Sequence, residues 1–211
     1  MDLYPYTEEL ANALTHGVGA IIFLVLCPLL IAFAVQSKDT GKIIGGCFFS
    51  FGLLIVYFSS TIFHAVVHDF AKEILHYFDL LAIYFLISGT YTAIVLIYFR
   101  DKMGFSLLGL IWAVSLLGVF LAIFFPNISS TYSLIIYLIL GWTGIILVKP
   151  SLKIMSIKVV SLIIFGGLSY TIGTYFYYYD QEIKFYHSIW HLFVLGGSLF
   201  HWTAIFLAIK K

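Results

Sequence analysis

Apolar residues fall into seven long runs along the chain, separated by short polar segments. A helix needs about 20 consecutive apolar residues to cross a bilayer core of about 30 Å, and each run comes close to that length. The expected spans lie near residues 13–35, 43–66, 77–99, 104–125, 131–148, 157–178 and 188–209. Because the connections leave no room for a sheet, we predict an all-α membrane protein in which residues 1–211 form a single seven-transmembrane helix bundle.

The composition supports a membrane location and excludes one class of partner. Hydrophobic residues make up 62% of the chain and charged residues only 10%, against about 25% charged in a soluble domain. The formal net charge is +1, and the basic residues lie between apolar runs instead of along one face, so we exclude nucleic acid as a partner. We expect membrane lipid to surround the protein and to be its partner. The sequence leaves the oligomeric state open.

The basic residues alternate with the spans in a way that predicts an orientation. Only Lys72 and Lys184 fall on one side of the expected bundle. The other side receives Lys38, Lys42, Arg100, Lys102, Lys149, Lys153, Lys158, Lys210 and Lys211. Short loops rich in Lys and Arg stay in the cytoplasm. We therefore predict a multi-pass protein of the plasma membrane with the amino terminus outside and the carboxyl terminus cytoplasmic.

Ionisable and polar side chains gather at the ends of three runs. His187 and His191 are four residues apart at the start of the seventh run, and Ser60 and His64 are four apart at the end of the second. Residues four apart share one helix face. Asp79 begins the third run, and up-and-down topology brings these three run ends to the same side of the membrane. A charge in hydrocarbon costs about 2.5–3.5 kcal/mol, so such a cluster indicates a functional site.

Three neutral imidazoles with an open fourth position are the ligand set of a catalytic zinc ion. We therefore predict that His64, His187 and His191 bind Zn²⁺, with Asp79 and Ser60 as catalytic residues beside a metal-bound water. Hydrogen bonding to a neighbouring helix is the alternative for any one membrane histidine taken alone.

Three further histidines were weighed as ligands. His68 is also four residues from His64, so the sequence leaves open which of the two belongs to the site. His76, like His68, lies near a loop, where an interfacial position is expected. His201 lies ten residues beyond His191, about 15 Å deeper along a helix, so we expect it to have a packing or hydrogen-bonding role.

Glu9, Asn12 and His16 are spaced three and four apart at the start of the first run, on the side of the proposed metal site. Carboxylates and amides behind a metal site orient its ligands, and we predict this supporting role for all three. An ordinary capped helix start with a wet first turn is the alternative.

Several short motifs, taken together, resemble the haemolysin III family, the prokaryotic branch of the progestin and adipoQ receptors. They are Glu9-x-x-Asn12-x-x-Thr15-His16-Gly17, Ser60-x-x-x-His64, Asp79 ahead of Leu86-Ile-Ser-Gly-Thr-Tyr-Thr92, Gly166-Gly-x-x-Tyr170-x-x-Gly173, and His187-x-x-Trp190-His191-x-Phe193. The resemblance covers nearly the whole chain. It implies a seven-helix bundle in which His64, His187 and His191 hold zinc.

The chain departs from the family pattern at two positions. Leu80 stands where the family often has His, and Ala93 where it often has Pro. Neither residue is a proposed ligand, so the predicted metal site is unaffected. The eukaryotic relatives imply that the metal lies on the cytoplasmic side, which is opposite to the orientation that the charges predict for this chain.

The resemblance implies an enzyme as the leading hypothesis: a zinc-dependent, ceramidase-like hydrolase of lipid amides or esters that acts in membrane lipid homeostasis. One rival is a non-enzymatic membrane sensor or receptor with a structural zinc, whose metal supports stability without any turnover. The other is a cytolytic, haemolysin-like protein. A pore would need polar residues along the whole depth of several helices, whereas here they cluster at one end.

Overall fold

The computed structural model describes residues 4–125 and 130–211, and every regular element in these ranges is helical. The elements are α1 (Tyr4–Gln36), α2 (Thr40–Ala65), α3 (Asp69–Tyr98), α4 (Lys102–Phe124), α5 (Ser130–Trp142), the 3₁₀ segment η1 (Thr143–Leu147), α6 (Val148–Ile154), α7 (Ile157–Tyr178) and α8 (Tyr186–Lys210). Within these described ranges, seven segments are long and apolar enough to cross a membrane. The predicted all-α, seven-span membrane protein is confirmed.

Two helices begin earlier than the apolar runs predict. The helix α1 starts at Tyr4 instead of near residue 13, and α3 starts at Asp69, so the expected connection from Val67 to His76 is wrong. Polar first turns can remain helical because water and capping side chains satisfy the free N–H groups at a helix start. The ring of His68 caps α3, where its Nδ1 accepts from the Ala71 backbone N–H at 3.4 Å.

The fifth span is broken, which the sequence analysis missed. Its helix changes to a 3₁₀ turn at η1, and α6 then carries the span past its expected end, to Ile154. The Tyr91 hydroxyl lies against this break, 2.9 Å from the carbonyl oxygens of Leu140 and Gly141, and it accepts from the Gly144 backbone N–H at 2.6 Å. A side chain of α3 thus satisfies backbone groups that the break releases inside the membrane.

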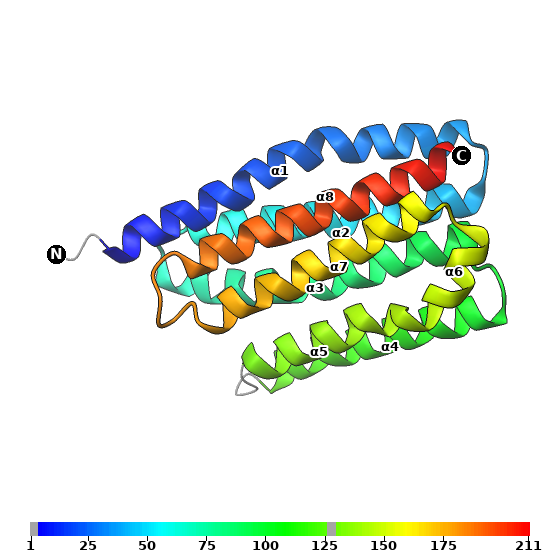
Figure 1. Ribbon diagram of the computed structural model, residues 1–211. Coiled ribbons are helices and arrows are strands. Elements are labelled where there is room, and N and C mark those ends of the chain that lie inside the picture. The colour runs from blue at the N-terminus through cyan, green and yellow to red at the C-terminus, as the bar shows by residue number, and fades with distance from the viewer. Residues whose placement is uncertain (1–3, 126–129) are drawn as a thin grey trace.

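The helices α2 and α3 are in extensive contact, and this contact depends on residues without a side chain. A Cβ atom at Gly52 would lie 2.8 Å from Leu86 Cα, and one at Gly89 would lie 2.6 Å from the Phe48 carbonyl oxygen. The helix α8 packs against α7 and α1, while α4 packs against the outer side of α3. Figure 1 shows the resulting bundle, in which the end of α2 and the starts of α1, α3 and α8 lie at one end.

Candidate metal centre

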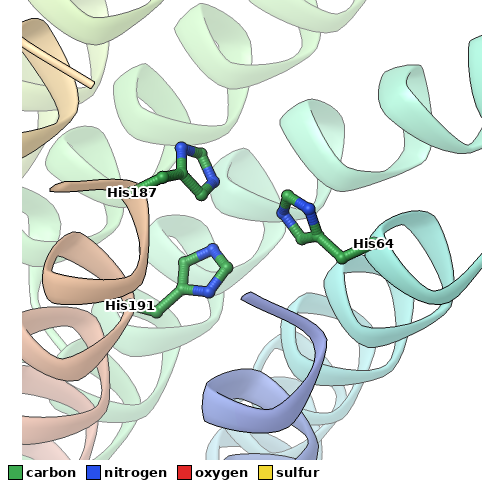
Figure 2. A group of neighbouring side chains, drawn as sticks. All are labelled: His64, His187 and His191. Atoms are coloured by element: carbon green, nitrogen blue, oxygen red, sulfur yellow. The ribbon is translucent and has the colours of Figure 1, made fainter. Parts of the chain in front are cut away.

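Three histidines from two helices meet at this end of the bundle. His64 lies in the last turn of α2, and His187 and His191 lie in the first two turns of α8. One ring nitrogen from each histidine can be chosen so that the three atoms lie within 4.8 Å of one another. The rings face a common point between the helices (Figure 2). Among the residues that the structure describes, these three form a group that could hold a metal ion.

Carboxylates fix two of the three rings. His64 Nδ1 lies 2.9 Å from Glu9 Oε2 on α1, and His187 Nδ1 lies 2.6 Å from Asp180 Oδ2 in the loop before α8. An ionised carboxylate can only accept, so each Nδ1 carries the proton and donates it. The Nε2 atom of each neutral ring is then left with its lone pair free.

A hydroxyl and a backbone carbonyl fix the third ring in the same way. His191 Nδ1 lies 3.0 Å from Thr15 Oγ1 and 3.2 Å from the Asn12 carbonyl oxygen. The Thr15 hydroxyl is itself directed at the Ala11 carbonyl oxygen, 2.9 Å away, so its oxygen accepts from His191. The Ser188 hydroxyl donates to Asn12 Oδ1 at 2.5 Å and ties the start of α8 to α1.

This arrangement fits a metal ion by its donor chemistry. Metal-ligating histidines donate their second ring nitrogen to a carboxylate or carbonyl, which fixes the tautomer and aims the ligand, and all three rings do so here. His64 Nε2 is buried and has no hydrogen-bond partner within residues 4–125 and 130–211. A buried nitrogen without a partner costs about 1–3 kcal/mol, and a bound cation would remove this cost.

Glu9 joins three helices at the site. Its Oε2 atom accepts from His64 on α2 and also from Lys72 Nζ on α3, at 2.8 Å. The Lys72 ammonium is also 3.3 Å from the Phe63 carbonyl oxygen, so it joins the end of α2 to the start of α3. Neither Lys72 nor Asp180 was proposed for the site from the sequence, because Asp180 lies in a loop and Lys72 lies before the third apolar run.

Ser60 and Asp79 lie where the sequence predicts, beside the histidines. Both line a cavity of about 250 Å³ that also borders His187 and His191. The Asp79 carboxylate is close enough to interact electrostatically with His187, and Ser60 is its polar neighbour. The Ser60 hydroxyl is fully buried and makes no hydrogen bond of normal geometry within the described part of the chain. The position of both residues is therefore known, while their catalytic roles stay predictions.

The cavity continues from this cluster toward the opposite end of the bundle. Beyond the cluster its wall is mainly apolar and comes from α3, α5, α7 and α8, and it reaches Ser151 and Met155 near the end of α6. Its wall on α3 runs from His76 to Ile94, about 27 Å at the helical rise of 1.5 Å per residue. The space thus crosses most of a hydrocarbon core of about 30 Å.

The other histidines take positions outside the three-histidine group. His68 caps α3, so within the described residues the group contains His64 and not His68. His76 lines the cavity, with its ring 5.2 Å from that of Phe63. His201 lies deeper, where its Nε2 is 3.1 Å from the Ile163 carbonyl oxygen.

The predicted supporting residues contact the group in two ways. Glu9 and Asn12 reach His64 and His191 by hydrogen bonds, as described above. His16 instead lies flat against His191, with ring centroids 3.5 Å apart and an angle of 19° between the rings. A stacked ring restricts how its neighbour can turn, but it does not set the tautomer of that neighbour.

Comparisons with known proteins agree with this architecture. The sequence model of the family described as "Haemolysin-III related" matches residues 4–202. The chain is 40% identical over 196 residues to "Hemolysin-3 homolog" of Bacillus subtilis (strain 168), covering 93% of this chain and 92% of that protein. It is 36% identical over 191 residues to "Hemolysin-3" of Bacillus cereus, covering 90% and 87%.

A more distant relative is human. The chain is 26% identical over 206 residues to "Monocyte to macrophage differentiation factor" of Homo sapiens, covering 94% of this chain and 83% of that protein. This similarity extends to the adiponectin receptor-like superfamily. The family match over nearly the whole chain and the two bacillar relatives lead to one conclusion: the chain is a multi-pass membrane protein that belongs to the haemolysin III family.

Proposed function

We propose that this protein is a zinc-dependent hydrolase of lipid amides or esters that acts in membrane lipid homeostasis. The observation that carries the proposal is the position of three anchored histidines beside a long, mainly apolar cavity. A metal placed only for structure would not need such a cavity next to it. A hydrolase of membrane lipids needs both features together.

The donor set favours zinc among the available metals. Three neutral imidazole nitrogens suit zinc better than calcium or magnesium, which prefer oxygen ligands. Catalytic zinc sites have three protein ligands and keep a fourth position open. When bound, zinc would supply a Lewis acid that activates water and polarises a carbonyl group.

Two side chains of the cavity wall have the chemistry for the remaining steps. Asp79 would accept the proton of the attacking water and then pass it to the departing nitrogen or oxygen. The Ser60 hydroxyl, which lies beside Asp79, would donate to the negative charge that develops on the carbonyl oxygen. Both groups line the space beside His187 where the reacting carbonyl would lie.

The cavity also favours a class of substrate. Its wall beyond the histidines is mainly apolar, although Thr90, Tyr91 and His201 are among the polar residues that also line it. Burial of apolar surface contributes about 25 cal/mol per Å², so a hydrocarbon chain is the favoured occupant. A lipid amide or ester would place its chain in this space and its carbonyl beside the histidines.

We further propose that the metal site faces outward, because the basic residues lie at the other end of the bundle. Figure 1 shows the α1–α2 and α3–α4 connections and α6 at the end opposite the start of α8. Labelling of intact cells with a membrane-impermeant maleimide tests this orientation in a chain whose two native cysteines are replaced. Lys184→Cys, at the metal-site end, is expected to react, and Lys149→Cys is not. The reverse pattern would overturn the orientation.

The central test combines metal analysis with turnover. Wild-type protein is expected to contain about one zinc per chain and to hydrolyse long-chain amides or esters, and His64→Ala is expected to lose both. His68→Ala is the matched control, because His68 lies four residues away but outside the group. Full lipid hydrolysis by His64→Ala would contradict the proposal, as would a wild-type protein without zinc.

One observation favours a second candidate, a membrane sensor or receptor with a structural zinc. The groups that fix the histidines come from α1, the α7–α8 loop and, through Lys72, α3, so a bound metal would also hold these segments together. Removal of zinc would then lower the unfolding temperature while no substrate is turned over. A cytolytic role, which the names of the two bacillar relatives suggest for those proteins, ranks third because the polar residues cluster at one end.

A further inference from the structure

His16 differs from the other buried histidines of the bundle. Its side chain is only 4% exposed, lies flat on His191 and contacts the ring of Tyr57 edge-on at 4.9 Å. It also lines the cavity. Neither of its ring nitrogens has a hydrogen-bond partner in residues 4–125 and 130–211.

His64 and His191, which are also buried, each have such a partner, and so does the half-buried His201. His64 donates to Glu9, His191 to Thr15 and Asn12, and His201 lies 3.1 Å from a carbonyl oxygen of α7. A buried polar group without a partner costs about 1–3 kcal/mol, and in native proteins such a group signals a missing ligand or water. Two unpaired nitrogens on one buried ring call for something that the protein itself does not supply.

The position of His16 limits what that partner can be. It is not among the three histidines whose nitrogens approach one another, so it is not placed as a metal ligand. A neutral imidazole offers one N–H donor and one lone pair, which suits an uncharged group that both donates and accepts. Ser60 and Asp79, on the same cavity wall, are polar neighbours of each other. His16 thus adds a further polar group to a mainly apolar space beside the metal group.

We propose that His16 binds the uncharged polar group, a hydroxyl or an amide, of a lipid held in the cavity. The hydrogen bond fixes this group beside the three histidines while the chain lies along the apolar wall. The stack on His191 holds the imidazole plane in place, so the ring is preorganised for its ligand. The inference rests on the proposed function only in its assumption that a lipid occupies the cavity, and it requires no turnover.

Two probes that cannot be hydrolysed test the inference: a fatty alcohol brominated at mid-chain and its methyl ether. Bromine quenches tryptophan fluorescence, and Trp142 and Trp190 line the cavity, so quenching in lipid nanodiscs reports the affinity of each probe. The ether lacks the O–H donor. Wild-type protein is expected to bind the alcohol about fivefold more tightly, the effect of one net hydrogen bond. His16→Phe, which keeps a ring on His191, is expected to bind both probes equally.

Two further variants and one further measurement separate binding from structure. His16→Gln keeps a donor and an acceptor and is expected to retain part of the preference. Tyr57→Phe removes a hydroxyl from the ring that contacts His16 edge-on, but that hydroxyl donates to Ser198, so the full preference should remain. The zinc content of His16→Phe is expected to equal that of wild type.

Three results would overturn the inference: an unchanged preference in His16→Phe, loss of zinc in that variant, or failure of both probes to quench the wild-type protein. Failure of the proposed hydrolase function gives a different pattern. In that case no amide or ester is turned over, while the alcohol preference still depends on His16.

Discussion

The two ends of the bundle use the same type of side chain for different purposes. At the basic end, Asp39 Oδ1 accepts from the backbone N–H groups of Gly41 and Lys42, and Asp101 Oδ1 accepts from Gly104 N. These are N-caps, in which a carboxylate satisfies its own chain within three residues. At the other end, Glu9 and Asp180 accept from histidines instead.

The donors in these contacts separate the two ends. Glu9 and Asp180 each accept from a ring nitrogen of a histidine in the candidate metal group, whereas each capping aspartate accepts from backbone N–H groups at the start of its own helix. Capping carboxylates start helices, and their removal changes stability. The carboxylates at the histidine end aim imidazoles, and their removal should change metal affinity while the helices remain.

The largest effect is expected at the histidine end, from the variant Asp79→Asn. We expect lipid hydrolysis to fall by about 10²–10⁴-fold, the usual contribution of a general base, because the amide cannot take the proton of the attacking water. Zinc content should stay at the wild-type value, since Asp79 is not in the three-histidine group. Turnover and elemental analysis are measured on the same preparation.

Asp69→Asn is the control for Asp79→Asn, because Asp69 begins α3 at the same end of the bundle and is exposed. It should behave as wild type. Undiminished turnover in Asp79→Asn would remove Asp79 from the mechanism and leave the metal site intact.

The carboxylates behind the ligands should have a smaller effect. Glu9→Gln and Asp180→Asn are each expected to weaken zinc binding by about 10–100-fold, as is usual when the partner of a metal-bound histidine is removed. Competition with a chelator of known affinity measures the change. Asp101→Asn at the basic end keeps the capping geometry and should leave zinc affinity unchanged. Equal zinc affinity in all four proteins would mean that these contacts do not tune the site.

The sequence predicted those parts of the molecule that depend on periodicity. Seven apolar runs gave seven spans, and four-residue spacing placed Ser60 and His64 on one face and His187 and His191 on another. Up-and-down topology then brought these residues to one end. Each step needs only the helical repeat and the thickness of a bilayer.

The sequence could not predict contacts that depend on tertiary structure. Asp180 lies in a loop, and nothing local shows that its carboxylate turns back to His187. The break at η1 was missed because its backbone groups are satisfied by Tyr91, which is about 50 residues away. The early start of α3 was missed because its first residues are polar. The apolar run marks only the part of α3 in the membrane, whereas the helix already begins at Asp69.

The smallest expected effect is at the basic end, where Asp39 caps α2 and pairs with Arg100 in the α3–α4 connection. The hydrogen bond from Arg100 lowers the pKa of the Asp39 carboxyl group. The folded-state pKa therefore lies below the unfolded value. The ion pair stabilises the protein fully above the unfolded pKa, and this contribution is lost as the pH falls through the folded pKa.

Two substitutions separate the pair from the cap. Asp39→Asn keeps a capping oxygen and should lower the free energy of unfolding by about 0.2–1 kcal/mol, as expected for an exposed ion pair. Asp39→Ala also removes the cap and should cost about 1 kcal/mol more. Thermal unfolding in detergent should show the Asp39→Asn difference at neutral pH, and the difference should vanish in acid. Zinc content should match wild type in both variants. A change in zinc content would show that the two ends are coupled.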